Sequence, residues 1–412
     1  MIGGAYGIAR VTLGIFPGYL VAVCDSYKSI IYVSTAVFSI GQIITIASEL
    51  HADFAYLYWA VFLCLYLSVL ACGGRFNILL ATLSVTLLLI YIFGAIRFAD
   101  FEKNAALPGE EGTDRWFHGG AYEFVSVLPL ATRFYQGIQS INLACGQIKN
   151  PKKEVPKGYV GAMSTVFVTS FAVLFIATSV KPGLDLFVIR PRPLSNGFKQ
   201  MFAMPPLRAT LLNLPATIMA GFGFMYYYGQ QISAMGKSGL LNPKFGWELP
   251  GRNTPIVALL VGSAFGYMLC VIQHLYPDTA DQIYSLSILG AVFTYLSIFA
   301  SFCMFRWYFP TIKREFTSPL GVYGAAYGAV VFALCFISVC GFQKDRLAII
   351  VFAIIIAVAS IYYYFVVRKR QVFSEEEKTV MFKAYLMKSK FLRFSVHNVY
   401  HVVCAQSKFI YH

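Results

Sequence analysis

Charged side chains are scarce in this chain, and three of them lie inside long apolar segments. Asp25 and Lys28 are three residues apart, and Arg133 lies within segment 124–148. A charge at bilayer depth costs about 2.5–3.5 kcal/mol on insertion scales, so such residues pair with one another or mark a pathway. The spacing of three places Asp25 and Lys28 on one helix face, where they can form an ion pair. We interpret the pair either as a structural contact or as a gating or coupling element.

The segment around Arg133 combines residues that weaken a helix with residues that bind polar groups. Pro129 and Gly137 both disfavour helical backbone. The polar side chains that follow are those of Gln136, Gln139, Ser140 and Asn142. Interrupted backbone at membrane depth is tolerated only where it is buried or lines a cavity, and discontinuous helices supply the sites of secondary transporters. Residues 133–142 are therefore the leading candidate for a binding site, and polar contact between helices is the alternative.

The predicted substrate-binding residues are Arg133, Phe134, Gly137, Ile138, Gln139 and Ser140. The glycine permits a kink and exposes backbone groups, while the phenylalanine and the isoleucine offer apolar contact. The amide and the hydroxyl can hydrogen-bond a substrate or the neighbouring helix. The arginine can meet an anionic group or pair with a nearby acid. A second mixed polar and aromatic segment, 221–231, is a further candidate to line a cavity.

The composition of the chain indicates that these residues lie in a membrane protein rather than in a soluble one. The chain has 412 residues, of which 58% are hydrophobic and 13% charged, and its net charge is +14. A soluble domain has about 25% charged residues, so this chain has too few charges to cover a surface that faces water. Its hydrophobicity also excludes disorder. The positive charge would suggest nucleic acid in a soluble protein, but in this chain it labels the sides of a membrane, and no nucleic-acid partner is predicted.

Enzymatic motifs are missing from the sequence. We find no phosphate-binding loop, no nucleophile elbow and no zinc-protease motif. The nine cysteines show no paired metal-ligand spacing. We therefore expect no enzyme, no cofactor and no metal.

Ten apolar windows predict ten membrane-spanning helices, because about 20 apolar residues cross a bilayer as a helix. They lie near 11–48, 54–74, 76–98, 124–148, 158–180, 209–236, 255–275, 282–305, 317–341 and 347–367. Together they form a transmembrane domain, 1–367, followed by a basic tail, 368–412. The tail interleaves lysines with aromatic residues over 378–394, which indicates either an interfacial helix on anionic lipid or a solvated segment.

Ten spans place both termini on one side of the membrane. Most of the 33 Lys and Arg residues fall on that side, so the positive-inside rule makes it cytoplasmic. The basic outer loop 181–208 is the one signal against this orientation.

Three stretches resemble the amino acid–polyamine–organocation (APC) superfamily of permeases. The clearest runs from Gly137-Ile-Gln139 to Asn150-Pro151-Lys-Lys-Glu-Val-Pro156-Lys-Gly158, and it is similar to the sixth helix of the family and the loop that follows. Gly3-Gly4-Ala5-Tyr6 resembles the entry to the third helix. Gly239 to Phe245, followed by Asn253-Thr-Pro255, resembles the loop between helices eight and nine. The matches occur in family order and are most similar to ethanolamine-permease-like and amino-acid-permease-like members.

The resemblance implies an all-α, multi-pass, inverted-repeat (LeuT-like) fold with five-plus-five symmetry and a site near the bilayer midplane. It also implies secondary active transport of amino acids or small amines by alternating access. The plasma membrane is the expected location. The coupling ion stays open between proton and sodium.

Two departures from the family pattern bear on function. Family members have two helices before the glycine-rich element that begins here at Gly3, so the ten spans would be helices three to twelve of an N-terminally truncated permease. We therefore expect this chain to transport poorly, and the alternative is a transport-inactive paralogue that acts as a binding or regulatory membrane partner. In addition, the residue two positions after Gly137 is Gln139 rather than an acid.

Overall fold

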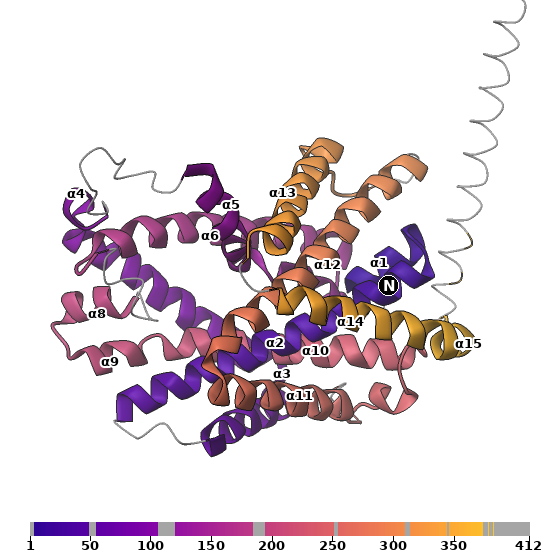
Figure 1. Cartoon of the computed structure of the whole chain (residues 1–412), viewed down its shortest axis with the longest axis horizontal. Coiled ribbons are helices and arrows are strands. Elements are labelled where there is room, and N and C mark those ends of the chain that lie inside the picture. The colour runs from indigo at the N-terminus through magenta and orange to yellow at the C-terminus, as the bar shows by residue number, and fades with distance from the viewer. Residues whose placement is uncertain are drawn as a thin grey trace, which may run out of the picture.

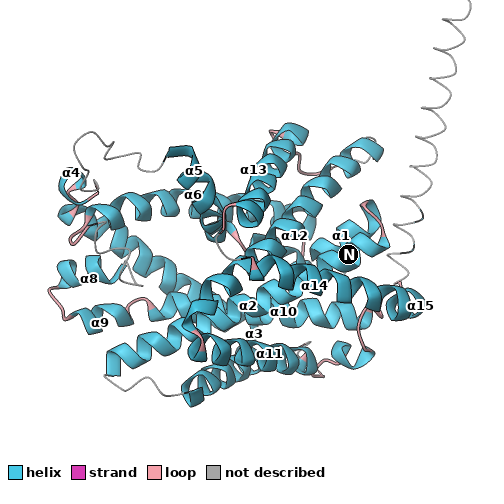
Figure 2. Cartoon of the chain, in the orientation of Figure 1, coloured by secondary structure: helices cyan, strands magenta, loops and turns pink. Residues whose placement is uncertain are grey.

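The computed structural model is a bundle of helices (Figure 1). It describes residues 4–48, 55–105, 120–183, 194–250, 254–309, 314–343 and 346–373, together with residues 378 and 382. Within these residues the regular structure is entirely helical, apart from the isolated bridges Ala99–Val180 and Leu249–Thr254 (Figure 2). The predicted all-α, multi-pass membrane fold is confirmed.

Eight long helices build the described part of the bundle. They are α2 (Ile15–Ser48), α3 (Ala55–Ala95), α6 (Pro151–Ser179), α10 (Leu214–Lys237), α11 (Ile256–Leu275), α12 (Ala280–Tyr308), α13 (Gly321–Gly341) and α14 (Leu347–Tyr362). The shorter helices are α1 (Gly4–Thr12), η1 (Ile96–Phe98), α4 (Phe101–Asn104), α5 (Gly120–Ala131), η2 (Thr132–Tyr135), η3 (Ile138–Gln147), α8 (Leu194–Phe202), α9 (Pro206–Leu211), η4 (Pro243–Gly246), η5 (Pro277–Thr279), η6 (Tyr363–Val367) and α15 (Arg368–Arg370).

Eight helical segments of the described chain are long and apolar enough to cross a membrane, where the sequence predicts ten. One difference lies in the expected spans 54–74 and 76–98, most of which belong to α3: Ile78–Phe98 is long and apolar enough to cross a membrane, whereas Leu57–Val69 is a shorter apolar segment. Helix α3 has 41 residues, so at about 1.5 Å per residue it is about 60 Å long, twice the hydrocarbon thickness. The backbone of α3 stays helical through Arg75, since neither glycine nor arginine removes a backbone hydrogen bond as proline does.

The other difference lies in the expected span 124–148, which is not one helix. It consists of α5, with Pro129 inside it, then η2, then Gly137 and η3. Gly137 has φ +96°, a left-handed conformation that ends one helical segment before the next begins. The interruption that the sequence predicts around Gly137 is therefore present.

Helix α2 lies at the centre of the bundle and carries the charged pair. It packs against α10, α12, α11 and α1, and 78% of its most apolar window is buried, against 11% for α14. Glycine allows close approach at one of these contacts: a Cβ on Gly290 of α12 would lie 2.5 Å from the hydroxyl of Tyr27. A charge on α2 is therefore enclosed by protein rather than by lipid.

The start of the predicted tail lies against the bundle. The backbone N–H of Val372 donates to Ser238 O at 2.9 Å, and the Arg10 guanidinium lies 4.5 Å from the Phe373 ring centroid. The predicted interfacial helix 378–394 lies outside the described residues, except for residues 378 and 382.

Candidate functional site

The buried centre of the bundle holds an ion pair between Lys28 and Asp25. Both side chains are fully buried, and the Lys28 ammonium donates to Asp25 Oδ1. Both residues lie on α2 at helical spacing, as the sequence predicts. Because isolated buried charges are strongly disfavoured, the pair requires further polar partners to be stable at this depth.

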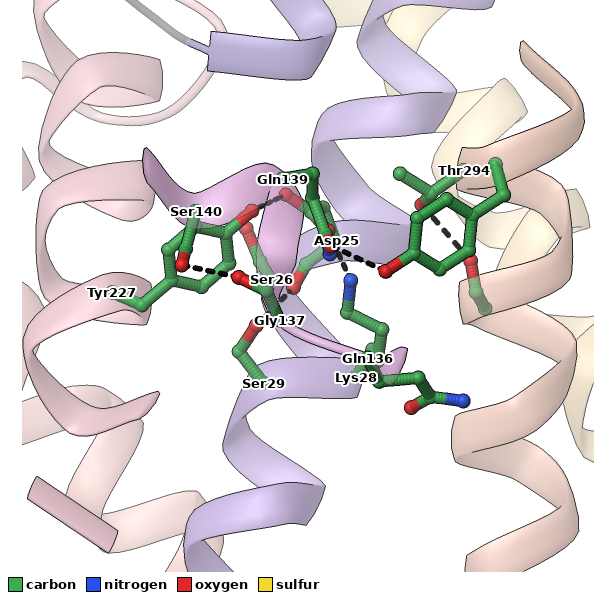
Figure 3. Close-up of polar contacts among 12 residues, drawn as sticks. Asp25, Ser26, Lys28, Ser29, Gln136, Gly137, Gln139, Ser140, Tyr227 and Thr294 are labelled. Carbon is green, nitrogen blue, oxygen red and sulfur yellow. Dashed lines mark hydrogen bonds and ion pairs between the residues drawn. The ribbon is translucent and has the colours of Figure 1, made fainter. Parts of the chain in front are cut away.

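Those partners come from three other elements (Figure 3). Gln139 Nε2, in η3, donates to Asp25 Oδ1 at 3.2 Å, and the Tyr227 hydroxyl of α10 donates to Asp25 Oδ2. Gln139 Oε1 accepts a hydrogen bond of 2.6 Å from the Tyr295 hydroxyl of α12. The carboxylate therefore has three donors, and the network joins α2, η3, α10 and α12.

Two aromatic rings lie near the Lys28 ammonium. Its Nζ is 6.0 Å from the ring centroid of Tyr227 and 6.0 Å from that of Tyr295. These distances are at the outer limit of cation–π attraction. Tyr227 donates to the carboxylate directly, and Tyr295 is joined to it through Gln139. Each of the two tyrosines therefore contacts the carboxylate network and also places its ring near the ammonium.

The interruption at Gly137 is held by a close contact with α10. A Cβ at Gly137 would lie 2.9 Å from the Phe224 ring carbon Cζ, so both the backbone conformation and the space favour glycine. The backbone N–H of Ser140 donates to Gly137 O at 3.0 Å, and the Ser140 hydroxyl donates to the same oxygen. This turn begins η3 and directs Gln139 toward α2.

A cavity of about 490 Å³ lies between this interruption and α10. Its lining residues are Gln136, Gly137, Ser140, Ile141, Leu143, Ala216, Met219, Ala220, Gly223, Phe224, Tyr226 and Tyr227. Its size lies within the range of small-molecule sites, which are mostly apolar with a few polar groups. Tyr227 belongs both to the cavity wall and to the Asp25 network, so the two features are adjacent.

The predicted binding residues divide into four groups in the structure. Gly137 and Ser140 line the cavity, and Gln139 turns away from it to the buried pair. Phe134 and Ile138 are not among the described residues that line this cavity, and Phe134 is 64% exposed. Arg133 makes aromatic contacts instead.

Arg133 lies between two tyrosine rings. Its guanidinium carbon is 4.1 Å from the ring centroid of Tyr284 on α12 and 5.4 Å from that of Tyr32 on α2. The Tyr32 ring stacks on Phe224 with centroids 4.5 Å apart, and its hydroxyl donates to Gln136 Oε1. These contacts join Arg133 to Phe224, the side chain that covers Gly137.

Sequence reasoning missed Tyr32 as part of this site, and it did not place Tyr284 beside Arg133. Aromatic residues are common in membrane helices, so their types alone single out none of them. The segment 221–231, predicted to line a cavity, does contribute Gly223, Phe224, Tyr226 and Tyr227 to the wall.

Apolar helices of membrane length, assembled around a buried ion pair and an interrupted helix, define a multi-pass membrane protein. A sequence model of the amino acid permease family matches residues 1–402. The chain therefore belongs to the amino acid permease family, and the resemblance to APC permeases is confirmed.

Relatives of the chain carry names of the same kind. It is 28% identical over 260 residues to a Schizosaccharomyces pombe protein named as the sexual differentiation process amino-acid permease isp5, covering 60% of this chain and 42% of that one. It is 23% identical over 246 residues to a Bacillus subtilis protein named as the threonine/serine transporter YbxG, covering 57% and 52%. The match thus spans about half the length of these curated relatives.

Proposed function

We propose that this chain carries the substrate site of a secondary active transporter for amino acids or small amines. The observation that carries the proposal is the cavity of about 490 Å³ at the Gly137 interruption, next to the buried Asp25–Lys28 pair. Interrupted helices with polar groups at membrane depth are the structural basis of substrate sites in secondary transporters. Family membership and the names of the relatives support the substrate class.

The cavity offers different surfaces to the two ends of an amino acid. Gln136 and Ser140 supply hydrogen-bonding groups beside the Gly137 backbone. Met219, Ala220 and other apolar side chains of α10 line the opposite part of the wall. A small zwitterion would place its charged groups at the interruption and its side chain against α10.

We propose the Asp25–Lys28 pair as the gating or coupling element. Gln139 donates to Asp25 from the same short helix that supplies Ser140 to the cavity wall. A substrate that moves η3 would therefore change the hydrogen bonding of the pair. Alternating access would follow from two arrangements of this segment, with proton or sodium as the coupling ion.

We place the protein in the plasma membrane with both termini cytoplasmic. The excess of Lys and Arg on the side that carries the termini supports this orientation. The tail beyond Phe373 would then lie next to the anionic inner leaflet, which attracts basic segments.

Uptake by the purified full chain in proteoliposomes tests the proposal. Radiolabelled amino acids and small amines would be offered under a pH gradient and, separately, under a sodium gradient. We expect saturable binding of such a compound, weakened in Ser140→Ala, with slow uptake at most. Ser84→Ala is the matched control, because its hydroxyl bonds to Leu80 O at 2.7 Å on α3, away from the cavity.

Isothermal titration of the same preparation separates binding from transport. If a folded preparation neither binds nor transports any of these compounds, the proposal is overturned in favour of a transport-inactive membrane partner. Equal effects of Ser140→Ala and Ser84→Ala would show that the cavity is not the site.

A further inference from the structure

A basic hollow lies at the start of α6, separate from the cavity described above. Its volume is about 660 Å³. The lining includes Lys152, Lys153, Lys157, Val160, Glu315 and Phe316. The first four residues belong to the first three turns of α6, and the last two to the loop between α12 and α13. We call this feature the α6 basic hollow.

The charge of the hollow favours an anion. Its lining residues include three lysines and one acidic residue, Glu315. Lys157 Nζ also lies 3.6 Å from Glu154, but these side chains are 63% and 53% exposed, so the contact holds the lysine only weakly. The hollow lies at the N-terminus of a 29-residue helix, where the macrodipole adds positive potential.

An exposed apolar stripe continues from the hollow along α6. Val160, Phe167, Phe171 and Leu174 follow one another at spacings of seven, four and three residues, and are 52%, 56%, 46% and 56% exposed. These spacings place them on one side of the helix. Only 11% of the most apolar window of α6 is buried inside the protein, so this face is open to lipid. A soluble anion would make no use of such a stripe.

We propose that the α6 basic hollow binds an anionic phospholipid. The lysines hold the phosphate of the headgroup, and an acyl chain lies along the stripe from Val160 toward Leu174. Phe316, 47% exposed in the hollow, packs at the level where headgroup and chain meet. The inference rests on the proposed function only in assigning this end of α6 to the cytoplasmic leaflet, since lipid binding requires no transport.

Native mass spectrometry of the full chain released from mixed micelles tests this site. The protein would be titrated with phosphatidylglycerol and with phosphatidylcholine, and bound lipids counted for each variant. The triple variant Lys152→Gln, Lys153→Gln, Lys157→Gln should bind phosphatidylglycerol more than about tenfold more weakly, since each basic residue near a membrane surface contributes about 1 kcal/mol. Glu315→Gln should bind it more tightly, because a repelling carboxylate is removed.

The control is Lys103→Gln, Lys181→Gln, Lys199→Gln, which removes the same charge from three exposed lysines elsewhere. Phosphatidylglycerol binding by this control should equal that of the unaltered chain. Equal loss in both triple variants, or no change in Glu315→Gln, would overturn the proposal. Displacement of the lipid by millimolar glycerol phosphate would assign the hollow to a soluble phosphate instead. Because no amino acid is present, failure of the transport assay leaves these outcomes unaffected.

Discussion

Replacing Asp25 by Asn removes the charge that balances Lys28 at the centre of the bundle. The carboxylate accepts hydrogen bonds from Lys28, Gln139 and Tyr227, and its side chain is fully buried. After the change, the ammonium keeps the Tyr227 and Tyr295 rings at 6.0 Å, a distance at which cation–π attraction replaces little of the lost ion pair. Removing one partner of a buried pair costs about 3–5 kcal/mol, and we expect a loss near the lower value because the amide still accepts hydrogen bonds.

The assay is unfolding of the purified chain in mixed micelles by added dodecyl sulfate, followed by circular dichroism at constant pH. Asp100→Asn is the matched control. Asp100 and Lys103 have the same spacing of three, lie 3.5 Å apart and are 43% and 79% exposed, so this change should cost less than about 1 kcal/mol. The large difference between two chemically identical substitutions would measure the effect of burial.

A double-mutant cycle identifies the interaction itself. Asp25→Leu with Lys28→Met removes both charges, and apolar replacement of a buried pair is often neutral or stabilising. The double variant should therefore be more stable than Asp25→Leu alone by about 2 kcal/mol or more. If the losses of unfolding free energy in Asp25→Leu and in Lys28→Met instead add to that of the double variant within about 0.5 kcal/mol, the two charges do not stabilise each other. That result would refute the reasoning.

Three further changes test the surrounding site. Gly137→Ala should destabilise the chain by about 1–2 kcal/mol in the same unfolding assay, because φ is +96° and the new Cβ would lie 2.9 Å from Phe224, and Phe224→Leu in the same chain should restore part of the loss. Tyr284→Leu should lower stability by about 0.5–2 kcal/mol through loss of the Arg133 contact, whereas Tyr284→Phe should retain it. Tyr227→Phe should cost about 1.5–3 kcal/mol by thermal unfolding, because a donor to the buried carboxylate is lost.

Features that depend on local spacing could be predicted from the sequence. The Asp25–Lys28 pair follows from a separation of three on a helix, and the interruption at Gly137 follows from proline and glycine within one apolar segment. The continuity of α3 could not be predicted in this way. Two apolar windows separated by one charge are compatible with two helices or with one, and only the surrounding packing decides between them.

Features that join distant segments required the structure. Tyr227 donates to Asp25 across 202 positions, and Tyr295 bonds to Gln139 across 156. Nothing in the local sequence of either tyrosine indicates its partner. The same limit explains Phe134: its position beside Arg133 indicated a role in binding, but which side of a short helix faces a cavity depends on helices that are far away in the chain.

The identity of Gln139 follows from the groups on either side of it. Its amide nitrogen donates to Asp25 while its amide oxygen accepts from Tyr295, so both functions of the side chain are used. A carboxylate at this position can accept from the tyrosine but cannot donate to Asp25, and it would place a second negative charge beside the first. The amide of Gln139 can therefore join η3 to the Asp25–Lys28 pair, where a carboxylate could not. Movement of η3 away from α2 must break the hydrogen bond to Asp25, which links the geometry of the cavity to the state of the pair.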